Sequence, residues 1–318
     1  MDEIDNKLFT LLDKNPRAPL SQLAKKILVS QQVADYRLKK MIENGIILKF
    51  GTIINLRSLG LEHYRVFLQL NSKNEYSHSQ IFQYLKNKKG VYWVARIGGK
   101  YDLALILFLK SFKEFDDFMD DFHKKFPDLI KNYINCHCLD HYIYQHKYAT
   151  HDYAKIHYGL NDLIVPIDKL DYNILLKMKD NCRISSLEIA KEEHVSYKTV
   201  INRIKLLEKK KVILGYRIYL QSTKNLKTMK HKQFIILLYF RNYSKLAEEK
   251  LMSYIATNEY VTQTIRMFGI WNIFLHVRIE DNEKLQELMI DLRAKFDIID
   301  TYELIPVFED IAINMMPV

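Results

Sequence analysis

The sequence has few cysteines and no long apolar runs. Only Cys136, Cys138 and Cys182 occur in 318 residues, too few for a disulfide framework, which favours a reducing compartment. The longest apolar runs, Leu103–Leu109 and Phe234–Phe240, have seven residues each, whereas a membrane-spanning helix needs roughly 18. The N-terminus is acidic and amphipathic, unlike a secretion signal. We therefore expect a cytoplasmic protein with no membrane partner.

Catalytic and cofactor motifs are also missing. The chain has no phosphate-binding glycine loop, no nucleophile elbow and no HExxH motif. Cys136, His137, Cys138 and His141 resemble a metal cluster, but alternation along a strand would place the cysteines on one face and the histidines on the other. Closed zinc sites need converging ligands, usually with a wider spacing between the cysteines. We therefore expect no metal, no cofactor and no catalytic residues.

The sequence does contain a long internal repeat. Residues 2–47 recur at 168–213 without an insertion, at a constant offset of 166 residues. A second match, at an offset of 170, aligns residues 96–102 with 266–272. A repeat of this length decides the architecture before any finer assignment. The chain is two copies of one module, and each module has two parts.

The positive charge is concentrated in the first part of each copy. The chain has a net charge of +10. Residues 1–60 hold 10 Lys/Arg against 6 Asp/Glu, residues 167–226 hold 13 against 7, and the remainder holds 25 of each. A basic field confined to one type of segment indicates a polyanionic partner, and nucleic acid fits best. The alternative, a solvated lysine-rich surface, would spread the charge over both parts.

The first part of each copy predicts a winged helix-turn-helix. Short amphipathic helices are expected at about 5–13 and 20–27, and a third helix begins after Ser30 or, in the second copy, Ser196 as the N-cap. The segments 45–48 and 212–216 follow the third helix, and each is interpreted as a wing hairpin. The alternative is a three-helix packing module whose basic face is only solvated.

The third helix of each copy is expected to contact double-stranded DNA. An apolar stripe would face the core, formed by Ala34, Leu38 and Met41 or by Val200, Ile204 and Leu207. The opposite face then presents side chains that bond base edges or phosphates in the major groove. The DNA-binding candidates are Gln31, Gln32, Tyr36, Lys39, Tyr197, Lys198, Thr199, Asn202 and Lys205.

Asp35 lies on the same predicted face as Lys39. A carboxylate that faces phosphates is repulsive. Either Asp35 accepts a hydrogen bond from cytosine N4, or the first copy binds DNA less well than the second.

The second part of each copy predicts a ferredoxin-like βαββαβ domain. In the first copy, strands are expected at about 64–70, 91–97, 101–109 and 130–144, with helices at 78–87 and 112–125. The second copy repeats this order, with strands at about 234–240, 260–267, 271–279 and 298–308 and helices at 245–258 and 283–295. The strands are almost wholly apolar, which indicates sheets covered on both faces and implies pairing of the two copies or of chains.

The predicted organisation is therefore α+β, with five segments. Residues 1–60 and 167–226 form winged helix-turn-helix domains, and residues 61–145 and 227–318 form ferredoxin-like domains. Residues 146–166 form a polar-aromatic linker that connects the two copies.

Several short motifs recur at matched places in both copies. They are the Asp-x-x-Asp start, Arg17 or Arg183 before the second helix, Leu-Ala or Ile-Ala inside it, and the Ser-to-Arg spacing of the third helix, with Gly45-Ile46-Ile47 after it in the first copy. Together with the order of the two parts, this combination resembles the Lrp/AsnC (feast/famine) transcriptional regulators. An ordinary member is one such unit that homodimerises. The tandem copy therefore implies that one chain forms a pseudo-dimer with two non-identical DNA-binding units, called reading heads below. It also implies a two-part operator and further self-association.

The resemblance also implies a response site for a small, amino-acid-like effector. That site lies near the hairpin between the second and third strands of the ferredoxin-like part. By position its residues are Gly98, Gly99, Lys100, Tyr101, Asp102, Gly269, Trp271 and Asn272. Glycines there permit positive φ and free backbone N–H groups for a carboxylate, although a tight turn also favours glycine. Trp271 in place of Tyr101 and Asn272 in place of Asp102 leave open whether the second copy senses an effector.

An enzyme is the main alternative, because sirohaem decarboxylases resemble this family in both parts and work as two-subunit or fused pairs. That resemblance implies a histidine along the second strand and paired arginines after the wing. Residues 91–96 and 261–266 contain no histidine, and residues 49–51 read Lys-Phe-Gly. A ligand-binding module that has lost DNA binding conflicts with the location of the charge. The sequence therefore favours a regulator that is not an enzyme.

Overall fold

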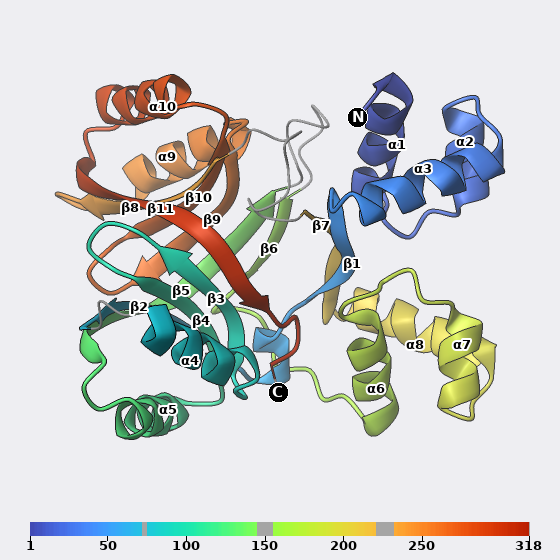
Figure 1. The fold of residues 1–318 in the computed structure, drawn as a ribbon, viewed down its shortest axis with the longest axis horizontal. Helices are drawn as coiled ribbons and strands as arrows, with labels where there is room; N and C mark the ends of the chain where they lie inside the picture. Colours follow the sequence, from blue (N-terminus) through green and yellow to red (C-terminus); the bar gives the residue numbers. More distant parts are fainter. Residues whose placement is uncertain (72–74, 145–154, 221–231, 318) are drawn as a thin grey trace. The chain divides into compact units, whose positions relative to one another are not determined.

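The computed structural model describes residues 1–71, 75–144, 155–220 and 232–317. These residues form two compact units, and each unit is assembled from both copies (Figure 1). Unit 1 contains Met1–Leu59 and the described parts of Gln145–Ile156 and Leu163–Met229. Unit 2 contains the described parts of Gly60–Tyr144 and Lys230–Val318, with His157–Asp162. Among the described residues, no helix has the length and apolarity needed to span a membrane.

Unit 1 consists of two three-helix groups, each followed by one strand. The first copy supplies α1 (Glu3–Lys14), α2 (Leu20–Lys26), α3 (Gln31–Glu43), β1 (Ile47–Ile54) and a short 3-10 helix (Arg57–Leu59). The second copy supplies α6 (Lys169–Met178), α7 (Ser186–Glu192), α8 (Tyr197–Lys209) and β7 (Ile213–Leu220). The three predicted helices are therefore present in both copies.

The repeated aspartates and arginine join the first helix of each group to the third. Asp2 caps α1 and accepts a hydrogen bond from the backbone N–H of Asp5 at 2.8 Å. The Nη1 of Arg37, on α3, lies 2.6 Å from Asp2 and 2.7 Å from Asp5. In the second copy Arg203 lies 2.7 Å from Asp168 and 3.2 Å from Asp171. The repeated motif thus has a structural function, because it combines a helix cap with an ion pair between two helices.

The prediction of a wing hairpin within each copy was wrong. Strand β1 pairs antiparallel with β7, so the two wings form one two-stranded sheet with a strand from each copy (Figure 1). The segments 45–48 and 212–216 enter these two strands and do not fold back on themselves. A single strand leaves its backbone groups without partners, and the matching strand of the other copy supplies them.

Each wing strand also lies against the first helix of the opposite copy. Strand β1 contacts α6, and β7 contacts α1. The Thr52 hydroxyl donates to the carbonyl of Met178 at 2.7 Å, and the Cys182 N–H donates to the carbonyl of Phe50 at 2.6 Å. The core under α1 accordingly includes Cys182 and Ile218 from the second copy. Residues of the second copy therefore complete the core of the first helix group, and the two groups belong to one compact unit.

Unit 2 contains both ferredoxin-like parts. The first copy supplies β2 (Glu62–Leu70), α4 (Glu75–Lys86), β3 (Val91–Ile97), β4 (Leu103–Leu109), α5 (Phe112–Lys125) and β5 (Ile130–Tyr144). The second supplies β8 (Lys232–Phe240), α9 (Lys245–Thr257), β9 (Val261–Phe268), β10 (Ile273–Ile279), α10 (Asn282–Lys295) and β11 (Ile299–Ile313). The predicted βαββαβ order is present in both copies.

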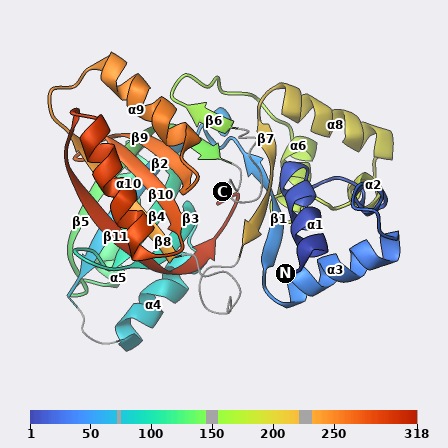
Figure 2. The same cartoon turned by 90° about the horizontal axis from the view of Figure 1, so that it is seen from above.

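The strands of the two copies join into one closed antiparallel sheet. Their order is β2-β4-β3-β11-β8-β10-β9-β5, and β5 pairs again with β2. The copies meet at two junctions, β3 with β11 and β5 with β9. Helices α4, α5, α9 and α10 cover the outer faces of the sheet (Figure 2). Closure removes the exposed edges that each four-stranded half would have alone.

The inward faces of the strands are buried between the copies. The Arg65 guanidinium lies inside, 4.0 Å from the centre of the Phe274 ring of the other copy, and burial lowers its pKa to about 10. The Phe67 ring meets Trp271 edge to face at 5.1 Å. Each strand is therefore covered by helices on one face and by the opposite copy on the other, which explains the nearly continuous apolar runs.

The predicted separation of the cysteines from both histidines on the last strand of the first copy was wrong. The register of β5 against β9 shifts between Cys138 and Asp140, which marks a bulge. A bulge reverses the alternation that follows it. His141 therefore lies on the same side as Cys136 and Cys138, and only His137 faces the other way. No group of three or more possible metal ligands occurs among the described residues.

Part of the predicted linker joins the sheet. Residues Lys155–Gly159 form β6, which pairs with β5. The rest of the linker up to residue 154, and the predicted domain boundary at 226/227, lie outside the described residues.

Candidate nucleic-acid interface

Helices α3 and α8 begin at well-formed caps. The Ser30 hydroxyl accepts from the backbone N–H of Val33 at 3.2 Å, and the Ser196 hydroxyl accepts from that of Thr199 at 3.0 Å. The predicted apolar stripes are confirmed, since Ala34, Leu38 and Met41 are buried in α3 and Val200, Ile204 and Leu207 are buried in α8. The cap and the stripe together fix which face of each helix is exposed.

The exposed faces carry nearly all of the predicted DNA-binding side chains. Tyr36 is 65% exposed and Tyr197 is 58% exposed. The polar and basic candidates Gln31, Gln32, Lys39, Lys198, Asn202 and Lys205 are also exposed. Thr199 differs, because it is half-buried and its hydroxyl bonds the Ser196 hydroxyl at 2.8 Å. Thr199 therefore belongs to the cap of α8 more than to its exposed face.

The two exposed faces differ in charge. Lys39 pairs with Asp35 one turn earlier, with 2.9 Å between Nζ and Oδ2, and this hydrogen bond raises the lysine pKa. The position of Asp35 corresponds to Ile201 in α8. Lys198 and Lys205 make no ion pair within the described part of the chain. Helix α8 therefore presents two uncompensated cations, whereas the one lysine among the α3 candidates is neutralised by its neighbour.

Two basic residues that recur before the second helix join the copies. The Arg17 Nη1 donates to the Tyr216 hydroxyl at 3.0 Å, and its guanidinium lies over the Tyr216 ring at 5.1 Å. Arg183 donates to the carbonyl of Pro16 and lies over the Phe50 ring at 5.3 Å. Each arginine thus contacts the other copy. This role depends on the β1–β7 pairing, so no sequence signal indicated it.

The predicted effector hairpins place their aromatic residues inside unit 2. Tyr101 and Trp271 are almost wholly buried, and their ring centres lie 6.1 Å apart, although they come from different copies. Only Gly99 and Lys100 in the first hairpin are exposed, and Gly99 has φ of +88°. In the second hairpin, a side chain at Gly269 would meet the Cys136 sulfur.

Asp102 and Asn272 perform the same structural task. The Asp102 carboxylate accepts from the backbone N–H of Leu70 at 2.7 Å, and the Asn272 carbonyl oxygen accepts from that of Phe240 at 2.8 Å. In each copy this bond ties the hairpin to the end of the first strand. Because an aspartate and an asparagine accept equally well here, this difference between the copies is not evidence of a lost sensing function.

Comparison with known proteins agrees with this geometry. The family "Winged helix-turn-helix DNA-binding" matches the chain at residues 1–47 and again at 167–213. These ranges contain α1–α3 and α6–α8, so the matched segment recurs with the repeat.

Two curated relatives are similar in sequence to less than half of the chain. The HTH-type transcriptional regulator FL11 of Pyrococcus abyssi is 28% identical over 120 residues, which cover 38% of this chain and 78% of that protein. The HTH-type transcriptional regulator LrpB of Bacillus subtilis is 29% identical over 126 residues, or 40% of this chain and 80% of that protein. Each relative has about the length of one copy, as a tandem duplication requires.

Solved structures of a siroheme decarboxylase are similar in fold over nearly the whole chain. The siroheme decarboxylase NirDL superposes with a TM-score of 0.67 and 13% sequence identity, covering 99% of this chain and 94% of that one. At this identity the likeness concerns the fold, which has the same tandem arrangement. The chain thus carries the winged helix-turn-helix segment twice and is similar in sequence to HTH-type transcriptional regulators.

Proposed function

We propose that this protein is a sequence-specific, double-stranded-DNA-binding transcriptional regulator. The observation that carries the proposal is the exposed polar face that occurs twice in one unit, on α3 and on α8. Both faces belong to segments with excess positive charge, and both are offered by the third helix of a winged helix-turn-helix, the helix that enters the major groove in such proteins. FL11 and LrpB are named as transcriptional regulators, which supports the same conclusion.

Because α3 and α8 share a unit, the operator is expected to have two parts in adjacent major grooves. The half-sites would be spaced by about one helical turn or a multiple of it. They are also expected to differ, since Gln31, Gln32 and Tyr36 on one helix correspond to Tyr197, Lys198 and Asn202 on the other. Identical footprints on both halves of a symmetric site, unchanged by substitutions in one helix alone, would contradict this.

The deciding experiment is a binding titration. A fluorescent duplex from the gene's own upstream region is titrated with the full chain across a range of salt, with random duplex as competitor. Specific binding predicts a complex that resists the competitor and an affinity that falls steeply with salt. If no fragment of the genome is bound more tightly than the random duplex at any salt concentration, the proposal fails.

An effector response, self-association and a cytoplasmic location complete the proposal. The exposed Gly99 and Lys100 support a small, amino-acid-like effector at the first hairpin, because free backbone N–H groups and an ammonium suit a carboxylate. Phe268 and Ile270, exposed at 73% and 49% beside the second hairpin, support contact with another chain. Light scattering with and without candidate amino acids tests both ideas, and a monomer unchanged by any of them would refute them.

We further infer that the chain is not an enzyme, although NirDL has the same fold. Strands β3 and β9 contain no histidine. Two of the buried histidines on other strands are engaged within the protein: His141 bonds Tyr158 at 2.6 Å and Gln263 at 2.9 Å, and His276 bonds Thr262 at 2.8 Å. Titration with a carboxylated tetrapyrrole, followed by absorbance, tests the inference. Stoichiometric binding with loss of carboxyl groups would overturn it.

A further inference from the structure

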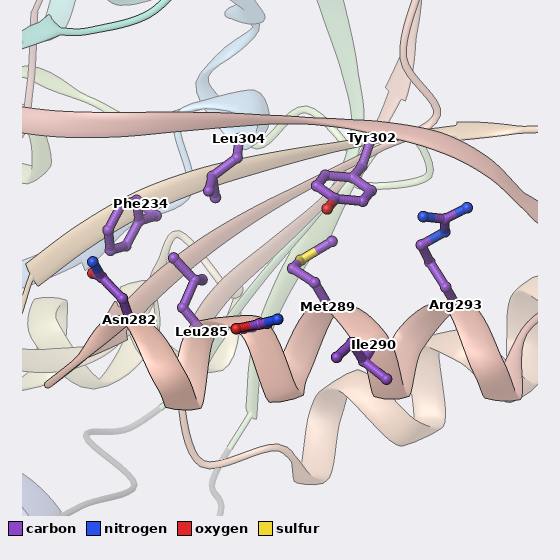
Figure 3. A pocket seen from close by; sticks show the side chains of 9 residues that line it. Phe234, Asn282, Leu285, Met289, Ile290, Arg293, Tyr302 and Leu304 are labelled. Carbon is purple, nitrogen blue, oxygen red and sulfur yellow. The ribbon is translucent and has the colours of Figure 1, made fainter.

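The second ferredoxin-like part has an open groove. In the first ferredoxin-like part, aromatic side chains occupy the corresponding place. The groove has a volume of about 650 Å³ and lies between α10 and the strands β8 and β11 (Figure 3). Its apolar lining is Phe234, Leu285, Met289, Ile290 and Leu304, and its polar lining is Asn282, Gln286, Arg293 and Tyr302. The volume is in the range of ordinary small-molecule sites, which are mostly apolar with a few polar groups.

In the first copy, aromatic rings occupy the matching place. The Phe112 and Phe115 rings stack at 5.8 Å, Phe115 stacks on Tyr64 at 4.8 Å, and Tyr64 lies 5.1 Å from His137. At the matched positions the second copy has Asn282, Leu285, Phe234 and Pro306. The two ferredoxin-like parts have the same backbone fold, and the groove is open in the second because its side chains at these positions are smaller.

The charge of the groove differs as well. Two carboxylates of α5, Asp116 and Asp120, correspond to Gln286 and Ile290 in α10. The one charged side chain in the groove lining is Arg293. Arg293 makes no ion pair, and the Tyr302 hydroxyl makes no hydrogen bond, within the part of the chain that the structure describes.

The polar groups are distributed unequally along the groove. Figure 3 shows Arg293 and Tyr302 at one end and Asn282 with Phe234 at the other. The Asn282 carbonyl oxygen already accepts from the Lys232 ammonium at 3.0 Å. Between the two ends lie Leu285, Met289 and Leu304, and Ile290, at the rim, is 60% exposed.

We propose that this groove binds a small amphipathic carboxylic acid, with its carboxylate at Arg293 and Tyr302 and its apolar body along Phe234, Leu285, Met289 and Leu304. A guanidinium recognises a carboxylate through two parallel hydrogen bonds, and a phenol supplies a third donor. A single cation in an otherwise uncharged lining suits one negative charge and not a polyanion. The site is separate from the hairpins and from α3 and α8, so it stands or falls independently of DNA binding.

The test is calorimetric titration of the full chain with decanoate, well below the concentration at which it forms micelles, and with decanol as the uncharged match. One decanoate per chain is expected, bound more tightly than decanol. R293Q should weaken decanoate binding about tenfold and remove its advantage over decanol, while Arg293→Lys should restore part of it.

Two further variants separate the groove from general apolar adsorption. Leu304→Asn introduces the residue type of Asn135, which holds the matched position in the first copy. This variant should weaken the binding of both decanoate and decanol. His123→Gln changes the first-copy counterpart of Arg293 and should leave both unchanged. Equal affinity of the wild type for decanoate and decanol, no binding of either, or an equal loss in the His123 variant would overturn the proposal. Unchanged thermal unfolding confirms that each variant is folded.

Discussion

Lys39 and Asp35 form an ion pair on the exposed face of α3, with 2.9 Å between the ammonium and the carboxylate. The corresponding pair of positions in α8 holds Lys205 and Ile201, so the same lysine has no carboxylate there. If both helices approach DNA, the phosphates near α3 meet a lysine that is already paired with a carboxylate, and the phosphates near α8 meet a lysine without such a partner. The two reading heads are therefore expected to contribute unequally to affinity.

Removing the carboxylate should strengthen DNA binding. In Asp35→Asn, Lys39 is released and a negative charge near the phosphates is lost, so we expect affinity for the operator to rise by up to about tenfold at low salt. The converse variant, Ile201→Asp, should weaken binding by a similar factor. Anisotropy titrations measure both. A fall in affinity specific to sites with cytosine opposite α3 would instead assign Asp35 to base recognition.

Removing a free cation should weaken binding and its dependence on salt. Lys198→Ala and Lys205→Ala are each expected to reduce affinity across sequences and to lower the slope of log K against log salt by about one. Lys250→Ala, on the exposed surface of α9, is the matched control. If affinity and slope stay at wild-type values, these lysines do not contact the phosphates.

A side chain at Gly51 should destabilise the paired wings. A Cβ built there lies 2.5 Å from the Tyr219 ring and 3.2 Å from the carbonyl oxygen of Lys179. We expect Gly51→Ala to lower the free energy of unfolding by about 1–3 kcal/mol, because a ring and a backbone oxygen must both move. Chemical denaturation measures the effect. The double variant with Tyr219→Ala should recover part of the loss, and simple additivity of the two changes would argue against the clash.

The junction between β5 and β9 should lose stability in acid. Asp140 accepts from His157 at 3.0 Å and pairs with Arg266 of the other copy at 2.5 Å. The hydrogen bond from His157, together with Arg266, holds the pKa of Asp140 below its ordinary value of 3.8 despite burial. A depressed carboxyl pKa means that its stabilisation is complete above about pH 4 and is lost as pH falls through the folded-state value.

Asp140→Asn is therefore expected to be less stable than the wild type by about 1–3 kcal/mol at pH 7. The difference should shrink below pH 4, where the wild-type carboxyl takes up its proton. Thermal unfolding from pH 7 to pH 2.5 follows both proteins. A difference that stays constant over this range would show that the charge of Asp140 does not contribute.

Local pattern was enough to predict the elements of this protein. The stripe through Ala34, Leu38 and Met41 has the helical period, and Ser30 and Ser196 are good N-caps. Because the repeat has a constant offset, each element could be predicted independently in both copies. Nearly all of the DNA-binding candidates lie on the exposed face because a buried stripe determines which residues remain outside. These inferences needed only contacts within a few residues along the chain.

The tertiary structure decided which strands pair with one another. Nothing in the sequence of β1 specifies whether it pairs with a strand of its own copy or with β7, because the alternation of side chains is the same in both arrangements. The bulge that brings His141 to the side of Cys138, and the contacts that Arg17 and Arg183 make with the other copy, follow from that wider geometry. The sequence by itself determined the repeat, the helices, the strands and the location of charge. The fold alone decided which strands of the two copies pair with one another, since strand edges and apolar faces are satisfied by whichever complementary surface lies within reach.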